Sequence, residues 1–202
     1  MIENKSSDVV WHSPTVTRVD RERQNGHRAC VIWFTGLSGA GKSTLAHALE
    51  AALFSRGMRT YVFDGDNVRH GLCGDLGFSP SDRRENLRRI GEMAKLFADA
   101  GVVGLAAFIS PLREDRELVR RIVGSDNFVE VFVSCPLDVC ETRDVKGMYR
   151  RARAGEIAEF TGISAPYEAP ESPDLVLETG RESIGDSVER MLSLILPRLS
   201  PP

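Results

Sequence analysis

Residues 36–43 read Gly-Leu-Ser-Gly-Ala-Gly-Lys-Ser, which matches the phosphate-binding pattern G-x-x-x-x-G-K-[ST]. Its glycines let successive backbone N–H groups turn toward the α- and β-phosphates of a nucleotide. Lys42 supplies a positive charge for the β- and γ-phosphates, and Ser43 offers a hydroxyl to Mg²⁺. An apolar run at residues 31–34 precedes the loop, and apolar residues at helical spacing follow it, as this motif requires. The sequence therefore predicts a binding site for a nucleoside triphosphate.

Two carboxylates, Asp64 and Asp66, stand two residues apart at the expected end of a later strand. One can reach Mg²⁺ or its water shell, and the other can accept a proton from a hydroxyl group. Phosphoryl transfer depends mainly on positioning and charge neutralisation, so one well-placed acceptor is sufficient. Asp-Gly and Asp-Asn are also common turn residues. Beside a phosphate-binding loop, the functional interpretation is favoured.

Ser79 and Pro80 have the pattern of a helix N-cap followed by a proline in the first turn. Arg83 and Asn86 lie three residues apart near the start of that helix and share one side of it. A helix N-terminus with an arginine is suited to an anion, and Phe78 just before it can stack on a flat base. These residues favour a small, anionic acceptor that contains a base.

Ser110 ends a third apolar run, at a position where many enzymes with this loop have a metal-side aspartate. We predict a small residue that lines a pocket, with its hydroxyl capping the helix expected after Pro111. A covalent phosphoserine role would need a neighbouring base.

Five apolar runs with the character of strands alternate with amphipathic helical patterns. They are Ala29–Thr35, Arg59–Asp64, Val102–Phe108, Phe128–Ser134 and Asp174–Glu178. Such alternation predicts an α/β fold of P-loop NTPase type, with a five-stranded parallel sheet and helices on both faces. Ligands bind such sheets beyond the carboxyl ends of the strands.

The chain divides into a polar arm, residues 1–28, and a single domain, residues 29–200. Trp11 is the large apolar residue of the arm and is expected to anchor it on the domain or on a partner subunit. Residues 143–173 are basic, then rich in Gly and Pro, with Phe160 and Tyr167 interleaved. A long segment with little core periodicity and dense charge is typical of an active-site lid.

The bulk composition is that of a cytoplasmic globular protein. Of the 202 residues, 42% are hydrophobic and 27% charged, and the net charge of −3 indicates no general attraction to nucleic acid or membranes. No apolar run is long enough to span a bilayer, and the polar N-terminus has no apolar signal-peptide core. The four cysteines lack C-x-x-C spacing and are expected to be buried, reduced thiols; they are Cys30, Cys73, Cys135 and Cys140.

Several classes of nucleotide-binding protein are excluded. The glycine order is not the G-x-G-x-x-G of dinucleotide-binding folds. The chain is too short for a motor, and it lacks the base-reading Asn/Thr-Lys-x-Asp motif of GTP switches. The loop alone leaves hydrolases and small-molecule kinases open.

Taken together, these segments resemble the adenylylsulfate kinase family, whose members phosphorylate adenosine 5′-phosphosulfate. The resemblance covers nearly the whole chain. Its segments include residues 9–12, 33–44, 64–72, 75–78, 108–111, 140–144, 146–156, 160–163 and 166–168. It implies transfer of the γ-phosphoryl group of MgATP to the ribose 3′-hydroxyl, giving 3′-phosphoadenosine 5′-phosphosulfate.

The resemblance also implies roles for individual residues. The ATP site would comprise Gly36, Leu37, Ser38, Gly39, Ala40, Gly41, Lys42, Ser43, Thr44 and, against the adenine, Arg143. The acceptor site would comprise Arg69, Phe78, Arg83, Asn86, Ile109 and Phe160, with the two phenylalanines on either side of the adenine. Asp66 would accept or orient the 3′-hydroxyl proton, and Ser43 and Asp64 would serve Mg²⁺. Ser110 matches a serine often designated a phosphoserine in this family, although direct in-line transfer is the preferred chemistry.

Departures from the family pattern are modest: Leu112 stands where Tyr or His is expected, and Met148 where Leu is expected. A homodimer is implied, while a sulfurylase partner and the use of the product, in sulfate reduction or in sulfation, stay open. Two other functions also stay open. One is a kinase for another small acceptor such as a nucleoside monophosphate, and the other is a non-catalytic nucleotide-sensing subunit.

Overall fold

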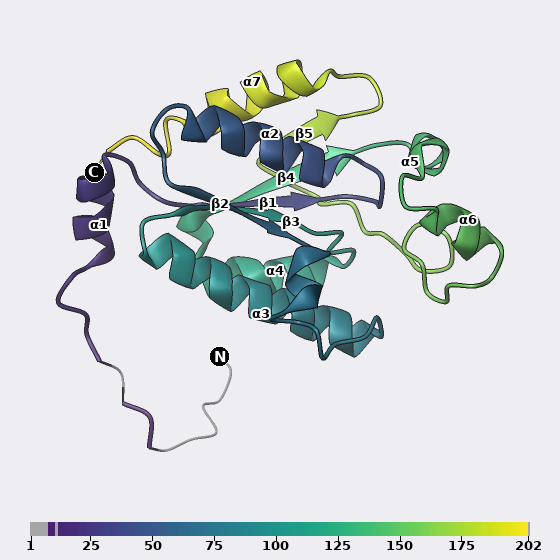
Figure 1. Ribbon diagram of the computed structural model, residues 1–202, viewed down its shortest axis with the longest axis horizontal. Helices are drawn as coiled ribbons and strands as arrows, with labels where there is room; N and C mark the ends of the chain where they lie inside the picture. Colours follow the sequence, from purple (N-terminus) through teal and green to yellow (C-terminus); the bar gives the residue numbers. More distant parts are fainter. Residues whose placement is uncertain (1–7, 11, 202) are drawn as a thin grey trace.

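The computed structural model describes residues 8–10 and 12–201 and contains a parallel sheet of five strands in the order β2-β3-β1-β4-β5 (Figure 1). The strands are β1 (Val31–Thr35), β2 (Thr60–Asp64), β3 (Val103–Ala107), β4 (Phe128–Ser134) and β5 (Leu175–Glu178). All five lie where the sequence predicts them, with ends that differ by at most two residues. The predicted α/β fold is confirmed.

The strand register brings the predicted chemistry to one edge of the sheet. Phe34 of β1 pairs with Ala107 of β3 and with Val131 of β4, and Asp64 of β2 pairs with the same Ala107. Because all the strands are parallel, the loops after β1, β2 and β3 leave from the same edge. The phosphate loop, the two aspartates and Ser110 therefore occupy one end of the molecule.

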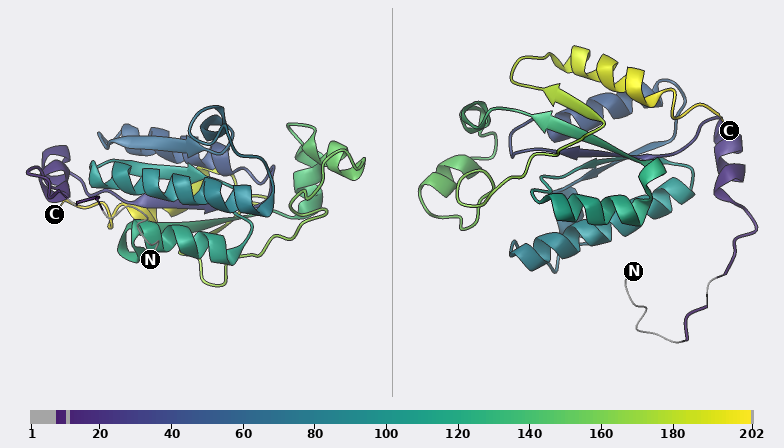
Figure 2. Two further views of the ribbon diagram at one scale, coloured as in Figure 1. Left: turned by 90° about the horizontal axis from the view of Figure 1, so that it is seen from below. Right: turned by 180° about the vertical axis from the view of Figure 1, so that it is seen from behind.

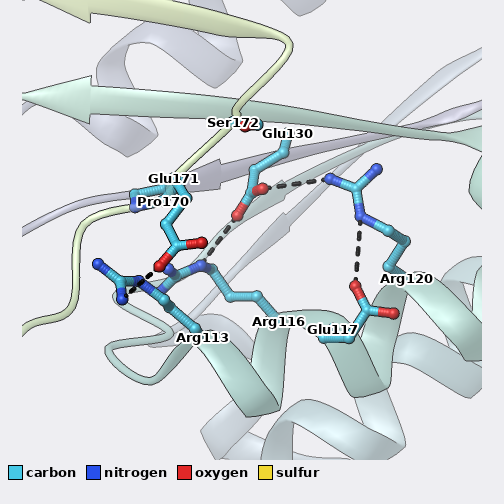
Figure 3. A pocket seen from close by; sticks show the side chains of 8 residues that line it. All are labelled: Arg113, Arg116, Glu117, Arg120, Glu130, Pro170, Glu171 and Ser172. Carbon is cyan, nitrogen blue, oxygen red and sulfur yellow. Dashed lines mark hydrogen bonds and ion pairs between the residues drawn. The ribbon is translucent and has the colours of Figure 1, made fainter.

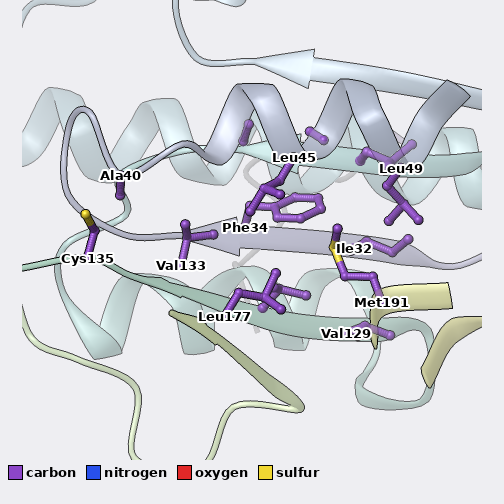
Figure 4. Close-up of a cluster of buried hydrophobic side chains, with 14 of the residues drawn as sticks. Ile32, Phe34, Ala40, Leu45, Leu49, Val129, Val133, Cys135, Leu177 and Met191 are labelled. Carbon is purple, nitrogen blue, oxygen red and sulfur yellow. The ribbon is translucent and has the colours of Figure 1, made fainter. Parts of the chain in front are cut away.

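Helices cover both faces of the sheet (Figures 1 and 2). On one face lie α2 (Lys42–Phe54) and α7 (Ile184–Ile195), and on the other lie α3 (Pro80–Asp99) and α4 (Arg113–Val123). On the first face, Ile32 and Phe34 of β1 pack in one buried cluster with Leu49 of α2 and Met191 of α7 (Figure 4). On the second face, the alternate residue Trp33 packs in a separate cluster with Ile90 of α3. Burial of both faces explains why β1 is apolar from Val31 to Phe34.

Helix α1 (Arg18–Asn25) lies within the arm and was not predicted. Thr17 and Asp20 form a reciprocal capping box at its start, and Gly26 ends it in the left-handed conformation. Its buried residue is Glu22, whose carboxylate accepts from the backbone N–H of Ala29 at 3.0 Å. Trp11, the predicted anchor, lies outside the described residues.

The predicted lid contains the end of α5 (Leu137–Arg143) and all of α6 (Met148–Arg153), and it projects beyond the strand ends (Figure 1). Part of this segment nevertheless contributes to the core. Tyr149 and Phe160 are buried with ring centroids 5.0 Å apart in an edge-to-face arrangement, and both belong to the α2-side cluster. Buried aromatic residues in a loop follow neither the helical nor the strand period, so a sequence pattern does not reveal them.

The sequence predicts that Ser79 and Ser110 each cap the N-terminus of a helix. Ser79 caps α3 as predicted, accepting from the backbone N–H of Asp82 at 3.2 Å, with Pro80 in the first turn. The prediction that Ser110 caps the next helix is wrong, because α4 begins only at Arg113 and the Ser110 hydroxyl is held elsewhere. Two short 3₁₀ helices, η1 (Asn67–His70) and η2 (Ser125–Asn127), complete the described elements.

The four cysteines are free and buried, as expected. Over the described residues, no helix is both long and apolar enough to cross a membrane.

Candidate active site

The phosphate loop follows β1 and depends on glycine for its path. Gly36, Gly39 and Gly41 all have positive φ, of 155°, 73° and 100°. A Cβ on Gly36 would lie 2.5 Å from the carbonyl oxygen of Val133 in β4, closer than any real contact. The loop can therefore pass over β4 only with glycine at position 36.

Lys42 is the first residue of α2 and is buried. Its Nζ donates to the carbonyl oxygens of Gly36 at 2.9 Å and Leu37 at 2.7 Å, across the loop. Burial lowers the pKa of the Lys42 ammonium to about 8. A charge held within the loop at this cost is suited to a polyanion, because phosphate oxygens would replace the two carbonyl acceptors with charged ones.

Ser43 and Asp64 meet at the ends of α2 and β2. The Ser43 hydroxyl donates to Asp64 Oδ2 at 2.6 Å, and the backbone N–H of Asp66 donates to Asp64 Oδ1 at 3.0 Å. Burial raises the pKa of Asp64, but these hydrogen bonds and that from the backbone of Asn67 outweigh it, so the pKa lies below its usual value. Asp64 is therefore an ionised carboxylate beside the Ser43 hydroxyl.

Asp66, the predicted proton acceptor, lies two residues further on, in the turn before η1, and its side chain is largely exposed. Its Oδ2 accepts from Lys146 Nζ, which comes from the lid, between α5 and α6. The lid thus places a cation against the carboxylate that the sequence predicts to meet the acceptor hydroxyl.

The start of α3 brings the predicted acceptor residues to the same end of the sheet. Arg83 donates to the carbonyl oxygen of Glu159 at 2.8 Å and to the hydroxyl of Thr161 at 3.0 Å, both in the lid. Asn86 is buried, and its Oδ1 has no hydrogen-bond partner among the described residues. A buried amide oxygen without a partner is costly, and a bound ligand would supply the missing donor.

The two phenylalanines predicted to enclose the adenine have other partners in this structure. Phe78 is 65% exposed and lies under the Arg69 guanidinium, which is 4.4 Å from its ring centroid. Phe160 is buried against Tyr149. Arg69 also donates to the carbonyl oxygens of residues 76 and 77, which fixes the loop before α3.

Ser110 is buried, with a φ of 39°. Its hydroxyl accepts from Trp33 Nε1 at 3.1 Å and donates to Thr35 Oγ1 at 3.0 Å. The Thr35 hydroxyl in turn donates to the carbonyl oxygen of Ile109 at 2.8 Å. These hydrogen bonds attach Ile109 and Ser110 to the end of β1. The Ser110 hydroxyl is therefore engaged in contacts that hold the structure together.

Arg143 lies at the end of α5 and donates to the carbonyl oxygens of Gly39 at 3.3 Å and Thr179 at 2.6 Å. Thr179, just after β5, donates its hydroxyl to the carbonyl oxygen of Ala40 at 2.7 Å, and Tyr149 donates to that of Ser38 at 2.9 Å. Neither Thr179 nor Tyr149 was predicted from the sequence as a site residue. The position of Thr179 at a strand end was the available signal, because strand ends in this fold line the ligand edge.

The other loop residues lie as expected of a phosphate-binding turn. Ala40 is buried and its N–H donates to the carbonyl oxygen of Leu37 at 3.2 Å. Thr44 is exposed on the first turn of α2, at the same end of the helix as Ser43.

The fold and this site define a P-loop phosphotransferase, with a phosphate loop, a paired carboxylate site and a lid that contacts both. The chain belongs to the adenylylsulphate kinase family, whose profile matches residues 28–178.

Relatives agree over nearly the whole length. The adenylyl-sulfate kinase of Prochlorococcus marinus is 58% identical over 192 residues, which are 95% of this chain and 96% of the relative. The Mycobacterium tuberculosis APS kinase solved with AMPPNP and APS has 49% identity and a TM-score of 0.81, covering 84% of this chain and 98% of that one. A hexameric APS kinase from Thiobacillus denitrificans has 32% identity and a TM-score of 0.65, covering 86% of this chain and 30% of that one.

Proposed function

We propose that this protein transfers the γ-phosphoryl group of ATP to the 3′-hydroxyl of adenosine 5′-phosphosulfate, forming 3′-phosphoadenosine 5′-phosphosulfate. The observation that carries the proposal is the meeting of donor and acceptor groups at one sheet edge. Lys42 and Ser43 begin α2, and Asp64 joins Ser43 directly at 2.6 Å. Asp66 lies two residues after Asp64, so the acceptor hydroxyl and the γ-phosphate would meet between the start of α2 and the end of β2.

Mg²⁺ is proposed to accompany ATP, and the donor set fits it. The Ser43 hydroxyl and the ionised Asp64 carboxylate are hard oxygen donors within hydrogen-bond reach of each other. Mg²⁺ takes few protein ligands and keeps phosphate oxygens and water for the rest. Bound there, it would neutralise charge on the β- and γ-phosphates.

The remaining roles follow from chemistry and position. Asp66 accepts or orients the 3′-hydroxyl proton, and Lys42 offsets charge on the transferred group. Arg83 and Asn86, at the start of α3, hold the anionic acceptor. The lid excludes water, which would otherwise accept the phosphoryl group and convert transfer into ATP hydrolysis.

We propose a homodimer as the working assembly. Large apolar side chains are exposed at the β2 edge of the sheet and on neighbouring helices: Phe54 is 72% exposed, Tyr61 52% and Leu96 68%. Exposed apolar groups of this size are typical of contact surfaces. Sedimentation velocity of the purified protein measures the assembly directly.

The test is a coupled assay of ADP and product formation with MgATP and adenosine 5′-phosphosulfate, with AMP as the alternative acceptor. We expect ATP turnover stimulated by the phosphosulfate and not by AMP. The Asp66→Ala variant should lose transfer, by about 10²-fold or more, and keep its affinity for ATP. Glu189→Ala, which removes an exposed carboxylate on α7, is the matched control and should behave like the wild type.

Each alternative function has its own outcome. Faster turnover with AMP would identify a nucleoside monophosphate kinase. ATP binding without turnover on any acceptor would identify a nucleotide-sensing subunit. Undiminished transfer by Asp66→Ala would remove the role given to that carboxylate.

A further inference from the structure

The lid returns to β5 through residues 166–171, and this return segment is tied to the start of α4. The backbone N–H of Glu168 donates to the carbonyl oxygen of Pro111 at 2.9 Å. The backbone N–H of Arg113 donates to Glu168 Oε2 at 2.8 Å, and Arg113 Nε donates to the carbonyl oxygen of Ala169 at 2.8 Å. Leu112 stands at the N-cap of α4 and cannot cap it, so a carboxylate 55 residues further along the chain does so.

Arg116, one turn into α4, joins the return segment to two further elements. Its guanidinium donates to the carbonyl oxygen of Ser110 at 2.7 Å, to that of Glu168 at 2.7 Å and to Glu130 Oε1 at 2.9 Å. The residue is only 3% exposed. Because a guanidinium is planar and its donors have fixed directions, the end of β3, β4 and the return segment are held in one geometry.

The same network reaches the phosphate loop. The Tyr167 hydroxyl lies 3.0 Å from Thr35 Oγ1, and Thr35 directly precedes Gly36. Ser110, whose carbonyl Arg116 holds, donates its hydroxyl to the same Thr35 oxygen. A displacement of the return segment would therefore be felt at the end of β1.

The hollow of about 260 Å³ beside Arg116 is not itself an anion site (Figure 3). Each arginine that lines it is paired: Arg113 with Glu171 at 2.8 Å, Arg116 with Glu130 at 2.9 Å, and Arg120 with Glu130 at 3.2 Å. The balanced charges indicate a structural connection between elements.

We propose that Arg116 and Glu168 are positioning residues that form a clasp for the lid. The clasp holds the C-terminal end of the lid in a fixed position, so that residues 144–165 close over the nucleotides about that fixed point. This inference rests on the proposed function. Without the clasp, Asp66 and Arg83 would still be present, but the lid that contacts them would lie in a wider range of positions. The acceptor would bind more weakly, and water would reach the γ-phosphate more often.

The informative variants are Arg116→Lys and Glu168→Ala. Lysine keeps a positive charge beside Glu130 but cannot reach the Ser110 and Glu168 carbonyls together. Glu168→Gln retains an oxygen acceptor for the Arg113 N–H and should restore most of the wild-type behaviour. Arg121→Ala is the control, because this exposed residue lies on the same helix and pairs only with Glu117 among the contacts described.

We expect KM for adenosine 5′-phosphosulfate to rise about 10- to 100-fold in Arg116→Lys and Glu168→Ala, the size seen when a distant change misplaces reacting groups. ADP formed without phosphorylated product should rise relative to ADP formed with it. Folded variants with unchanged KM and unchanged ratio would overturn the proposal and leave the clasp a purely structural feature.

Amide hydrogen exchange of residues 144–165 in the free protein separates this proposal from the proposed function. We expect faster exchange there in both clasp variants and not in Arg121→Ala. If the wild type fails to phosphorylate the phosphosulfate, the proposed function fails while the exchange data still test the clasp. If Arg116→Lys does not fold, Tyr167→Phe replaces it, since it removes only the hydroxyl that meets Thr35. Unchanged exchange in the folded variants would contradict the clasp.

Discussion

The buried ammonium of Lys42 is placed where a phosphate group would bind. Its ammonium lies within hydrogen-bond reach of two loop carbonyls, and burial lowers its pKa to about 8. The charged form is therefore held at a cost, which an incoming polyphosphate removes by supplying negative charge.

The first prediction concerns the proton balance of ATP binding. Phosphates beside Lys42 should raise its pKa above the free value of about 8. At pH 8 the free protein is then about half protonated at this position, and binding should take up about half a proton. Well below pH 8 the lysine is already charged and uptake from it should vanish, whereas above pH 8 the affinity for ATP should fall. Calorimetry in buffers of different ionisation enthalpy measures the uptake.

The control for this proton balance is Lys42→Met, which keeps the length of the side chain and removes the titrating group. Its residual ATP binding should show no such uptake at pH 8. Equal uptake by the variant and the wild type would assign the proton to another group.

At the scale of the elements, the contact between β4 and the phosphate loop sets the second prediction. A Cβ at position 36 would lie 2.5 Å from the Val133 carbonyl, so Gly36→Ala must displace either the loop or β4. We expect a loss of about 1–3 kcal/mol in the free energy of unfolding, the usual cost of overpacking, together with weaker ATP binding. Urea unfolding and calorimetric titration measure the two effects.

A matched glycine lies in α7. A Cβ on Gly185 would meet only the Ser183 hydroxyl, at 3.7 Å, and the residue is helical. Gly185→Ala should therefore leave ATP binding unchanged and stabilise the protein slightly, by up to about 1 kcal/mol. A similar loss of stability in both variants would show that the Gly36 contact is not special.

The elements also show what the sequence could and could not predict. The three central strands were predictable because burial of both faces makes them apolar, and Ser79 with Pro80 marked the start of α3. The cap of α4 was not, since its donor and acceptor are 55 residues apart and only the folded chain joins them. Helix α1 was not predicted because it buries one residue, Glu22, and so has no apolar stripe at helical spacing. Its capping box, Thr17 and Asp20, was nevertheless visible in the sequence. In the candidate site, position at strand ends was predictable, while lid partners such as Lys146 depended on tertiary contacts.

At the scale of the whole molecule, α1 ties the two ends of the chain to the sheet. Asn25 donates to the carbonyl oxygen of Gly101 at 2.9 Å, and His27 Nε2 accepts from the backbone N–H of Arg59 at 3.0 Å. The backbone N–H of Arg28 donates to the carbonyl oxygen of Leu199 at 3.0 Å, beside the C-terminus. We propose that the stable unit begins near residue 17, whereas the sequence places the start of the domain at residue 29.

Two truncations test this proposal. Removal of residues 1–16 should leave the free energy of unfolding unchanged, because the described residues among them are exposed. Removal of residues 1–28 deprives the backbone N–H groups of Ala29 and Arg59 of their acceptors, at a cost of about 1–3 kcal/mol for each one left unsatisfied. Urea unfolding at several protein concentrations measures both and separates monomer stability from assembly. Equal stability of the two truncated proteins would place the boundary at residue 29. A loss in the shorter truncation that is present at high protein concentration and vanishes on dilution would show instead that residues 1–16 contact a second copy.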